Sequence, residues 1–333
     1  MNVAPVTVDG TGSVRFTLET VLGPALGGLL LRDFAWQSIF LINLPLAACA
    51  YLFVRRYVPC DLTSNERPRF DYLGSILLMV ALVSYALAMT SGGKLGVVNL
   101  ALLAGALLMF GLFAVVQTRS AAPLVQPELF RSPSLRRGFV ISVLASSVAM
   151  STLVIGPFYL VGALNLGSAE TGLVMATGPL FAALVGVPAG WGVDRWGTGR
   201  MLIVGLSAMA FGSFVMALVA AEQGVLGYIG PLLLLTAGFS TFQAANNTAL
   251  LATANATQRG VVSGLLNLSR NLGFISGAAA LSAVFVWVSG VVDFASAERS
   301  DVLAGTHAVF AVATGLVVLA WMISVLGEMR AQT

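Results

Sequence analysis

Residues 139–163 read FVISVLASSVAMSTLVIGPFYLVGA, a continuous apolar stretch that contains no charged side chain. A helix needs about 20 mostly apolar residues to cross the hydrocarbon core of a bilayer, so this stretch is long enough for one span. Strands of a membrane barrel alternate between apolar and polar residues, and no such alternation is present here. The stretch therefore predicts a transmembrane helix.

The same pattern recurs along the chain. Of the 333 residues, 58% are hydrophobic and only 9% are charged, and the mean hydropathy is +0.92. So few charges could not cover the surface of a soluble protein of this length. We predict an all-α polytopic membrane protein with about 10 transmembrane helices, at residues 16–31, 38–54, 72–91, 96–117, 139–163, 170–190, 201–221, 225–251, 260–288 and 303–326.

The basic residues indicate the orientation of these spans. Lys and Arg accumulate in cytoplasmic loops of membrane proteins. With a cytoplasmic N-terminus, twelve fall in inner loops or the tail: Arg55, Arg56, Arg67, Arg69, Arg119, Arg131, Arg136, Arg137, Arg195, Arg200, Arg259 and Arg330. Only three, Arg32, Lys94 and Arg299, fall outside. We therefore expect a multi-pass protein with both termini in the cytoplasm.

Polar linkers divide the chain into four parts. Residues 1–60 contain two predicted helices and 61–117 an inserted pair, whereas 118–137 form a cytoplasmic connector with three prolines. Residues 138–333 contain six helices, which is the half-size of a common transporter architecture. This last part is expected to be one C-terminal six-helix half, and the first part a remnant of an N-terminal half.

Several functional classes find no support in the sequence. Basic residues are spread over separate loops, so the net charge of +3 does not indicate nucleic-acid binding. No GxxxxGK loop is present, and we expect no ATP, no cofactor and no enzymatic activity. Cys49 and Cys60 are not placed for a disulfide, and the single histidine, His307, makes a metal site improbable.

Polar side chains within the spans are candidates for a transport path. Arg270 lies about ten residues into its span, where a charge costs roughly 2.5–3.5 kcal/mol in lipid. Helical spacing places two polar sets on single helix faces: Ser263, Asn267, Arg270 and Asn271, then Gln243, Asn246 and Asn247. Tyr159 adds to a weaker stripe with Ser146, Ser147 and Ser151. The polar faces of the spans at 260–288 and 225–251 are expected to line a central transport path. The alternative is that these side chains form hydrogen bonds between helices.

Glycine pairs indicate close helix packing. The spacings Gly186/Gly190, Gly260/Gly264 and Gly273/Gly277 allow two helix backbones to approach each other. Gly-Pro pairs within spans at 23–24, 156–157, 178–179 and 230–231 predict kinks, because proline removes a helix hydrogen bond. Ordinary bundle packing would use the same features.

Four ordered motifs carry a family resemblance. The first is GPALGG at 23–28, followed by WQSIFLINLP at 36–45. The second is DYLG at 71–74, and the third is PLV at 123–125 together with LFR at 129–131. The fourth lies at 263–273 and consists of SG, Asn267 and RNLG. Together they resemble the fourteen-helix drug:proton antiporter branch of the major facilitator superfamily. Ten spans then imply a major-facilitator-type helix bundle that lacks the first four helices of that branch.

The resemblance also implies a function and further site residues. It implies proton-coupled efflux of amphipathic drugs or related small molecules across the cytoplasmic (inner) membrane, with a small-molecule substrate, protons and the lipid bilayer as partners. The antiporter motif would be Gly23, Pro24, Gly27 and Gly28, and a gating loop would comprise Gly190, Asp194, Arg195, Gly197 and Arg200. Among the residues themselves, Glu19 is the proton-coupling candidate, because it is the only plausible carboxylate inside a span, whereas Glu170 and Glu222 lie at span ends.

Two alternatives remain open at this point. The chain could be a non-transporting fragment, because only one six-helix wall of a pathway would be complete. It could also be a membrane-embedded interaction or regulatory protein that packs on a partner through its remnant helices.

Overall fold

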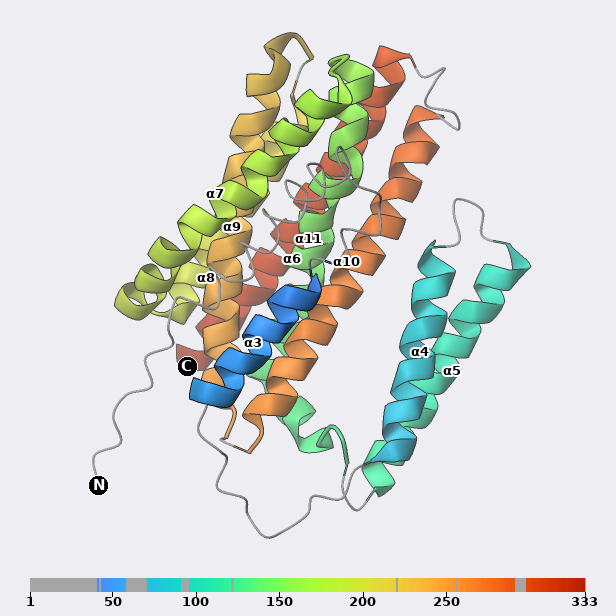
Figure 1. The fold of residues 1–333 in the computed structure, drawn as a ribbon, viewed down its shortest axis with the longest axis vertical. Helices are drawn as coiled ribbons and strands as arrows, with labels where there is room; N and C mark the ends of the chain where they lie inside the picture. Colours follow the sequence, from blue (N-terminus) through green and yellow to red (C-terminus); the bar gives the residue numbers. More distant parts are fainter. Residues whose placement is uncertain are drawn as a thin grey trace.

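A computed structural model describes residues 41, 43–57, 71–90, 96–120, 123–219, 221–255, 257–290 and 298–332. These residues form nine α-helices and no β-strand (Figure 1). The helices are α3 (Asn43–Tyr57), α4 (Tyr72–Thr90), α5 (Val97–Arg119), α6 (Pro133–Phe158), α7 (Ser168–Trp196), α8 (Thr198–Ala217), α9 (Gly224–Thr253), α10 (Arg259–Ser289) and α11 (Arg299–Gln332).

The observed helices confirm the predicted all-α membrane fold. Within the described residues, eight helices are long and apolar enough to cross a bilayer, namely α4 to α11. Their bounds follow the apolar runs to within a few residues, because a span ends where its loop becomes polar. Helix α3, with 15 residues, overlaps the span predicted at 38–54 but is not among these eight, whereas the span expected at 16–31 lies outside the described residues.

Helices α6 to α11 pack together as one bundle. The most extensive contacts join α8 to α9, α6 to α10, α8 to α11 and α7 to α9. A Cβ atom on Gly277 of α10 would lie 2.5 Å from the Cα of Ser147 on α6. The close approach expected of Gly273/Gly277 is thus present, whereas a Cβ on Gly260 or Gly264 would meet nothing within 4 Å in the described structure.

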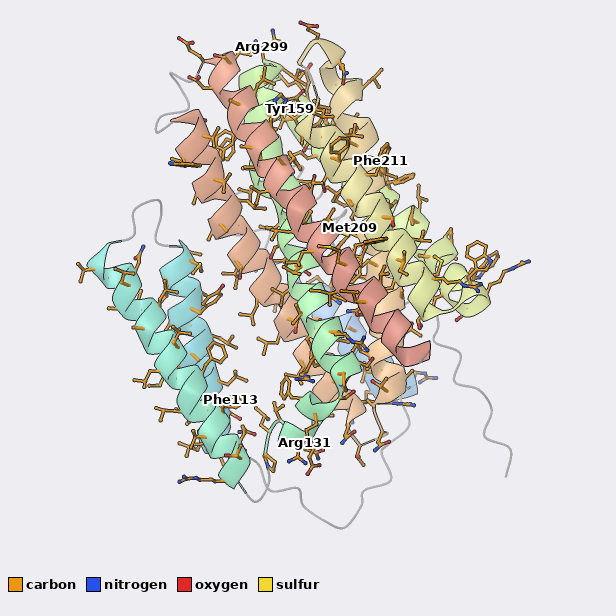
Figure 2. The ribbon with its side chains drawn as sticks, turned by 180° about the vertical axis from the view of Figure 1, so that it is seen from behind. Phe113, Arg131, Tyr159, Met209, Phe211 and Arg299 are labelled. Atoms are coloured by element: carbon orange, nitrogen blue, oxygen red, sulfur yellow. The ribbon has the colours of Figure 1, made fainter. Side chains whose placement is uncertain are left out.

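The C-terminal end of α6 changes its hydrogen-bonding pattern. Pro157 lies inside the helix. The helix is followed directly by a π-helical turn, η2, which comprises Tyr159–Ala163. Proline has no N–H to donate, which weakens the regular helix ladder at this point. Figure 2 places Tyr159 near the end of the bundle that carries Arg299, and Arg131 at the opposite end.

Helices α4 and α5 form an antiparallel pair that stands beside α10 (Figure 1). Asp71 accepts a hydrogen bond from the Gly74 amide at 2.8 Å and one from Gln117 Nε2 on α5 at 2.6 Å. Gln117 Oε1 in turn accepts from the Val125 amide at 3.0 Å. These bonds tie the DYLG and PLV motifs together, and they connect the pair to the segment that leads into α6.

Candidate substrate cavity

Four helices of the bundle enclose a cavity of about 210 Å³. Its walls come from α6, α7, α9 and α10, and none of its lining side chains is charged. The apolar part includes Met175, Phe239 and Phe274, and the two phenylalanine rings lie 6.4 Å apart at 56°. The polar lining consists of Thr152, Tyr228, Thr236, Ser240 and Gln243. A site of this composition suits an apolar ligand with a few hydrogen-bonding groups.

Most hydroxyl groups of this cavity donate hydrogen bonds to backbone carbonyls of the helices. Thr152 donates to Ala149 O at 2.9 Å, Thr236 donates to the carbonyl of Leu232, and Ser240 donates across to Ala182 O of α7 at 3.3 Å. Because each of these hydroxyls uses its hydrogen in such a bond, its oxygen remains available only as a hydrogen-bond acceptor for a ligand. Gln243 is half-buried and makes no hydrogen bond within the described structure, so its carboxamide offers a donor and an acceptor to a ligand.

One of two stacked, buried tyrosines lines the cavity. Tyr228 of α9 lines it, and its ring stacks on Tyr159 with centroids 5.5 Å apart and planes at 19°. Both side chains are fully buried, and neither hydroxyl has a hydrogen-bond partner among the described residues. A buried donor without a partner costs about 1–3 kcal/mol. The Tyr228 hydroxyl is buried against Gly156 of α6, so a bound ligand would satisfy it only if this contact opened.

The polar residues predicted on α10 lie outside this cavity. Ser263, Asn267 and Asn271 are exposed, and Asn271 donates to Asn267 O at 2.9 Å. Arg270 is half-buried and its Nη2 donates to Asn247 Oδ1 on α9 at 3.4 Å. The structure thus joins the two predicted polar faces at one pair, Arg270 and Asn247.

The structure separates the three polar residues predicted to share one face of α9. Gln243 lines the cavity, Asn247 contacts Arg270, and Asn246 is buried with its Nδ2 donating to Gly138 O of α6 at 3.4 Å. Successive helix residues differ by about 100° in direction, so Asn246 and Asn247 meet different helices. The predicted serines of α6 likewise lie in helix contacts, and Ser147 Oγ lies 2.9 Å from Gly273 O.

The predicted gating loop is shorter than expected. Gly190, Asp194 and Arg195 belong to α7, and Arg200 belongs to the first turn of α8. The two helices are joined by Gly197 alone, which has φ +87°. This backbone conformation favours glycine, as expected for the turn. Asp194 makes no ion pair among the described side chains.

Two predicted features lie outside the described residues. These are the antiporter motif, Gly23, Pro24, Gly27 and Gly28, and the proton-coupling candidate Glu19.

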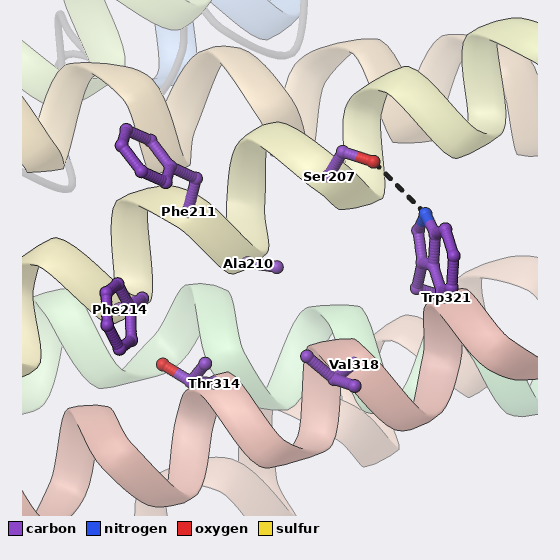
Figure 3. Close-up of a pocket in the computed structure, with 7 residues that line it drawn as sticks. All are labelled: Ser207, Ala210, Phe211, Phe214, Thr314, Val318 and Trp321. Atoms are coloured by element: carbon purple, nitrogen blue, oxygen red, sulfur yellow. Dashed lines mark hydrogen bonds between the residues drawn. The ribbon is translucent and has the colours of Figure 1, made fainter.

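A second hollow, of about 380 Å³, lies between α8 and α11 (Figure 3). Phe211, Phe214 and Val318 line it, and Trp321 donates to Ser207 Oγ at 3.1 Å across it. Phe211 is 60% exposed and Phe214 50% exposed, and no residue predicted for the transport path contributes to the hollow. This surface is suited to contact with lipid.

Sequence reasoning missed most of the cavity wall. Tyr228, Leu232, Thr236, Phe239 and Gln243 recur at spacings of three and four along α9, which places them on one helix face. That spacing was readable in the sequence. The contributions of Phe274 and Met175 were not, because they depend on how α7 and α10 pack against α9.

The fold and the site define a multi-pass helical membrane protein with a central cavity inside a six-helix bundle. Residues 13–278 match the Major Facilitator Superfamily. The chain belongs to this superfamily of transporters.

Curated relatives support this membership. The chain is 31% identical over 276 residues to the "Uncharacterized transporter YebQ" of Escherichia coli (strain K12), covering 81% of this chain and 60% of that protein. It is 29% identical to the "Riboflavin transporter RibZ" of Clostridioides difficile (strain 630), covering 83% and 59%, respectively. It is also 29% identical to the "Tetracenomycin C resistance and export protein" of Streptomyces glaucescens, covering 79% and 49%. The chain thus spans about half to three-fifths of the length of these relatives.

One solved structure shows the same fold. The chain superposes on a crystal structure of the nucleoside transporter NupG with a TM-score of 0.52 at 12% sequence identity, covering 96% of this chain and 83% of that one.

Proposed function

We propose that this chain belongs to a proton-coupled efflux transporter that exports amphipathic drugs or related small molecules across the cytoplasmic membrane. The observation that carries the proposal is the uncharged cavity among α6, α7, α9 and α10, which is lined by aromatic rings and by the carboxamide of Gln243. Such a lining suits a flat aromatic molecule with a few hydrogen-bonding groups. Riboflavin and tetracenomycin C, named for two relatives, have this chemistry.

We further propose that the chain corresponds to the last ten helices of the fourteen-helix antiporter branch. The ordered motifs favour this branch, and the relatives are longer than this chain. Residues 138–333 would be the C-terminal half, 61–117 the inserted pair, 118–137 the connector and 1–60 the remnant of the N-terminal half. Both termini would be cytoplasmic. Reporter tags placed after Arg131 and after Leu166 test this topology, because they should label opposite faces of the membrane.

An accumulation assay tests the export activity. The chain is expressed in cells that lack their own efflux pumps, and the cellular content of riboflavin and of ethidium is measured with and without a protonophore. We expect lower accumulation than in empty-vector cells, and we expect the protonophore to abolish the difference. Equal accumulation in both strains would favour the alternative of a non-transporting fragment or a membrane-embedded interaction protein.

Proton coupling is tested by two substitutions in vesicles. Glu19→Gln removes the predicted carboxylate, and Arg270→Ala removes the cation that contacts Asn247. We expect either change to reduce substrate-driven proton flux at least about tenfold, since one charged hydrogen-bonded group is worth about 1.5–3 kcal/mol. Unchanged flux in both variants would remove these residues from the coupling mechanism.

A further inference from the structure

A third cavity, of about 210 Å³, opens at the end of the bundle that carries Arg131 (Figure 2). It lies between the first turns of α6 and α8 and the last turns of α9 and α11. A single water occupies about 30 Å³ in the liquid, so the cavity is large enough for more than one water. None of its lining residues belongs to the substrate cavity.

The polar groups of this cavity are donors for an anion. The Arg137 side chain lines it, and Arg137 Nε donates to Pro133 O at 3.1 Å, which leaves the terminal guanidinium nitrogens for other acceptors. Gly327 of α11 makes room for this side chain, because a Cβ there would lie 2.7 Å from the guanidinium carbon. An arginine held in this way presents a fixed fork of N–H groups, which matches the oxygens of a phosphate.

Two helix N-termini meet at the same place. Ser134 of α6 and Thr198 and Gly199 of α8 line the cavity in the first turns of their helices. The N-cap residue of α6, Ser132, forms no side-chain capping bond, and the N-cap residue of α8, Gly197, has no side chain to form one. The first N–H groups of a helix have no partner within the helix, and they carry partial positive charge. Both helices therefore add favourable potential for an anion, whereas the C-terminal end of α9, which lines the cavity through Leu250, adds potential of the opposite sign, so the net attraction depends on Arg137.

An independent observation points to a ligand at this position. Ser324 of α11 is only 8% exposed and lines the cavity, yet its hydroxyl makes no hydrogen bond in the described structure. Ser269 of α10 bonds to Leu265 O of the preceding turn, whereas the hydroxyls of Ser146 and Ser213 are buried without a partner among the described residues, so Ser324 is distinguished by its position at the cavity. The Ser324 hydroxyl is left free beside a cavity that is rich in donors.

We propose that this cavity binds a phosphate group, held by Arg137, by the first turn of α8 and by the Ser324 hydroxyl. The phosphate of an anionic lipid headgroup and a free phosphate have the same chemistry. The position at the ends of four membrane helices favours the lipid, and the experiment separates the two sources.

The test uses the full chain purified in a neutral detergent. Native mass spectrometry counts bound phosphatidylglycerol and bound phosphatidylcholine at equal concentrations, with inorganic phosphate as a competitor. We expect phosphatidylglycerol to bind about tenfold more tightly than phosphatidylcholine. Competition by millimolar inorganic phosphate would assign the site to soluble phosphate, whereas persistence of the lipid adduct would assign it to the headgroup.

Matched variants connect the binding to this cavity. Arg137→Gln and Gly327→Ala should each weaken phosphatidylglycerol binding about tenfold, the first by removing the charge and the second by displacing it. The control Arg136→Gln removes the same charge from the exposed neighbouring residue and should leave binding unchanged. Gly327→Ala replaces glycine with a better helix former, so it tests the site even if Arg137→Gln fails to fold.

Two outcomes would overturn the proposal. The first is equal binding of the two lipids by the unmodified chain. The second is an equal loss of binding in Arg136→Gln and Arg137→Gln, which would indicate unspecific surface attraction.

Discussion

The ring of Tyr159 stacks on the ring of Tyr228 at a centroid distance of 5.5 Å, and the two hydroxyls are buried without a hydrogen-bond partner in the described part of the chain. Gly156 permits this arrangement, because a side chain there would collide with the Tyr228 hydroxyl. Only Tyr228 lines the substrate cavity. The pair therefore leaves one unsatisfied polar group beside the candidate substrate cavity, and a transported molecule would reach it if the contact with Gly156 opened.

Replacement of Tyr228 by phenylalanine tests this role. Tyr228→Phe should weaken binding of a tight-binding substrate about fivefold, since one neutral hydrogen bond is worth about 1 kcal/mol. The same change should not lower the thermal stability, because it removes a buried hydroxyl that has no partner among the described residues. Equilibrium binding and thermal unfolding in detergent provide the two readouts. Tyr159→Phe is the control, and an equal loss of affinity there would contradict a direct contact by Tyr228.

The contact between α6 and α10 should be sensitive to the smallest added side chain. Gly277→Ala places a methyl group against the backbone of Ser147, and overpacking of this kind costs about 1–3 kcal/mol. Gly264→Ala is the matched control on the same helix, since its methyl group meets nothing within 4 Å in the described structure. We expect a lower Tm for Gly277→Ala and an unchanged or higher Tm for Gly264→Ala. The opposite order would show that α6 and α10 are not packed as described.

The hydrogen bonds of Asp71 give the helix pair a pH dependence. The Gly74 amide, followed by the Gln117 side chain, lowers the pKa of Asp71 below its ordinary value of 3.8. The folded chain then binds fewer protons at this site than the unfolded chain, so the interaction stabilises the fold above about pH 3.8. This stabilisation is lost as the pH falls through the lowered pKa.

Two variants separate the cap from the charge. Asp71→Ala removes the acceptor at the start of α4 and should destabilise the chain by about 1 kcal/mol at pH 7. Asp71→Asn keeps an acceptor for the Gly74 amide, but it should abolish the contribution of this residue to the pH dependence. Thermal unfolding at pH 7 and at pH 3 measures both effects. A pH dependence unchanged by Asp71→Asn would assign the titration to other carboxylates.

The helices were predictable from the sequence because each span depends on a local property, the length of an apolar run. The apolar run at 139–163 was sufficient to place α6 and η2 together as one span. The partner of each polar side chain depends on packing between helices far apart in the sequence. Helical spacing grouped Gln243 with both Asn246 and Asn247, yet the neighbouring helices separate all three.

The bonds among Asp71, Gln117 and Val125 show the same limit. The sequence marked two of these residues within separate motifs, at 71–74 and 123–125. Gln117 at the end of α5 bridges them, and no local pattern distinguished it from any other polar residue at a helix end. The antiparallel packing of α4 on α5 creates this contact, so it became visible only in the three-dimensional structure.

Chemical protection of a single cysteine tests the substrate cavity most directly. In a background with Cys49 and Cys60 replaced by serine, Gln243→Cys places a thiol in the cavity, and Ser207→Cys places one in the hollow between α8 and α11. Riboflavin or ethidium should slow alkylation of the thiol at position 243 and leave the rate at position 207 unchanged. Protection at 207 without protection at 243 would contradict the central claim that α6, α7, α9 and α10 enclose the substrate.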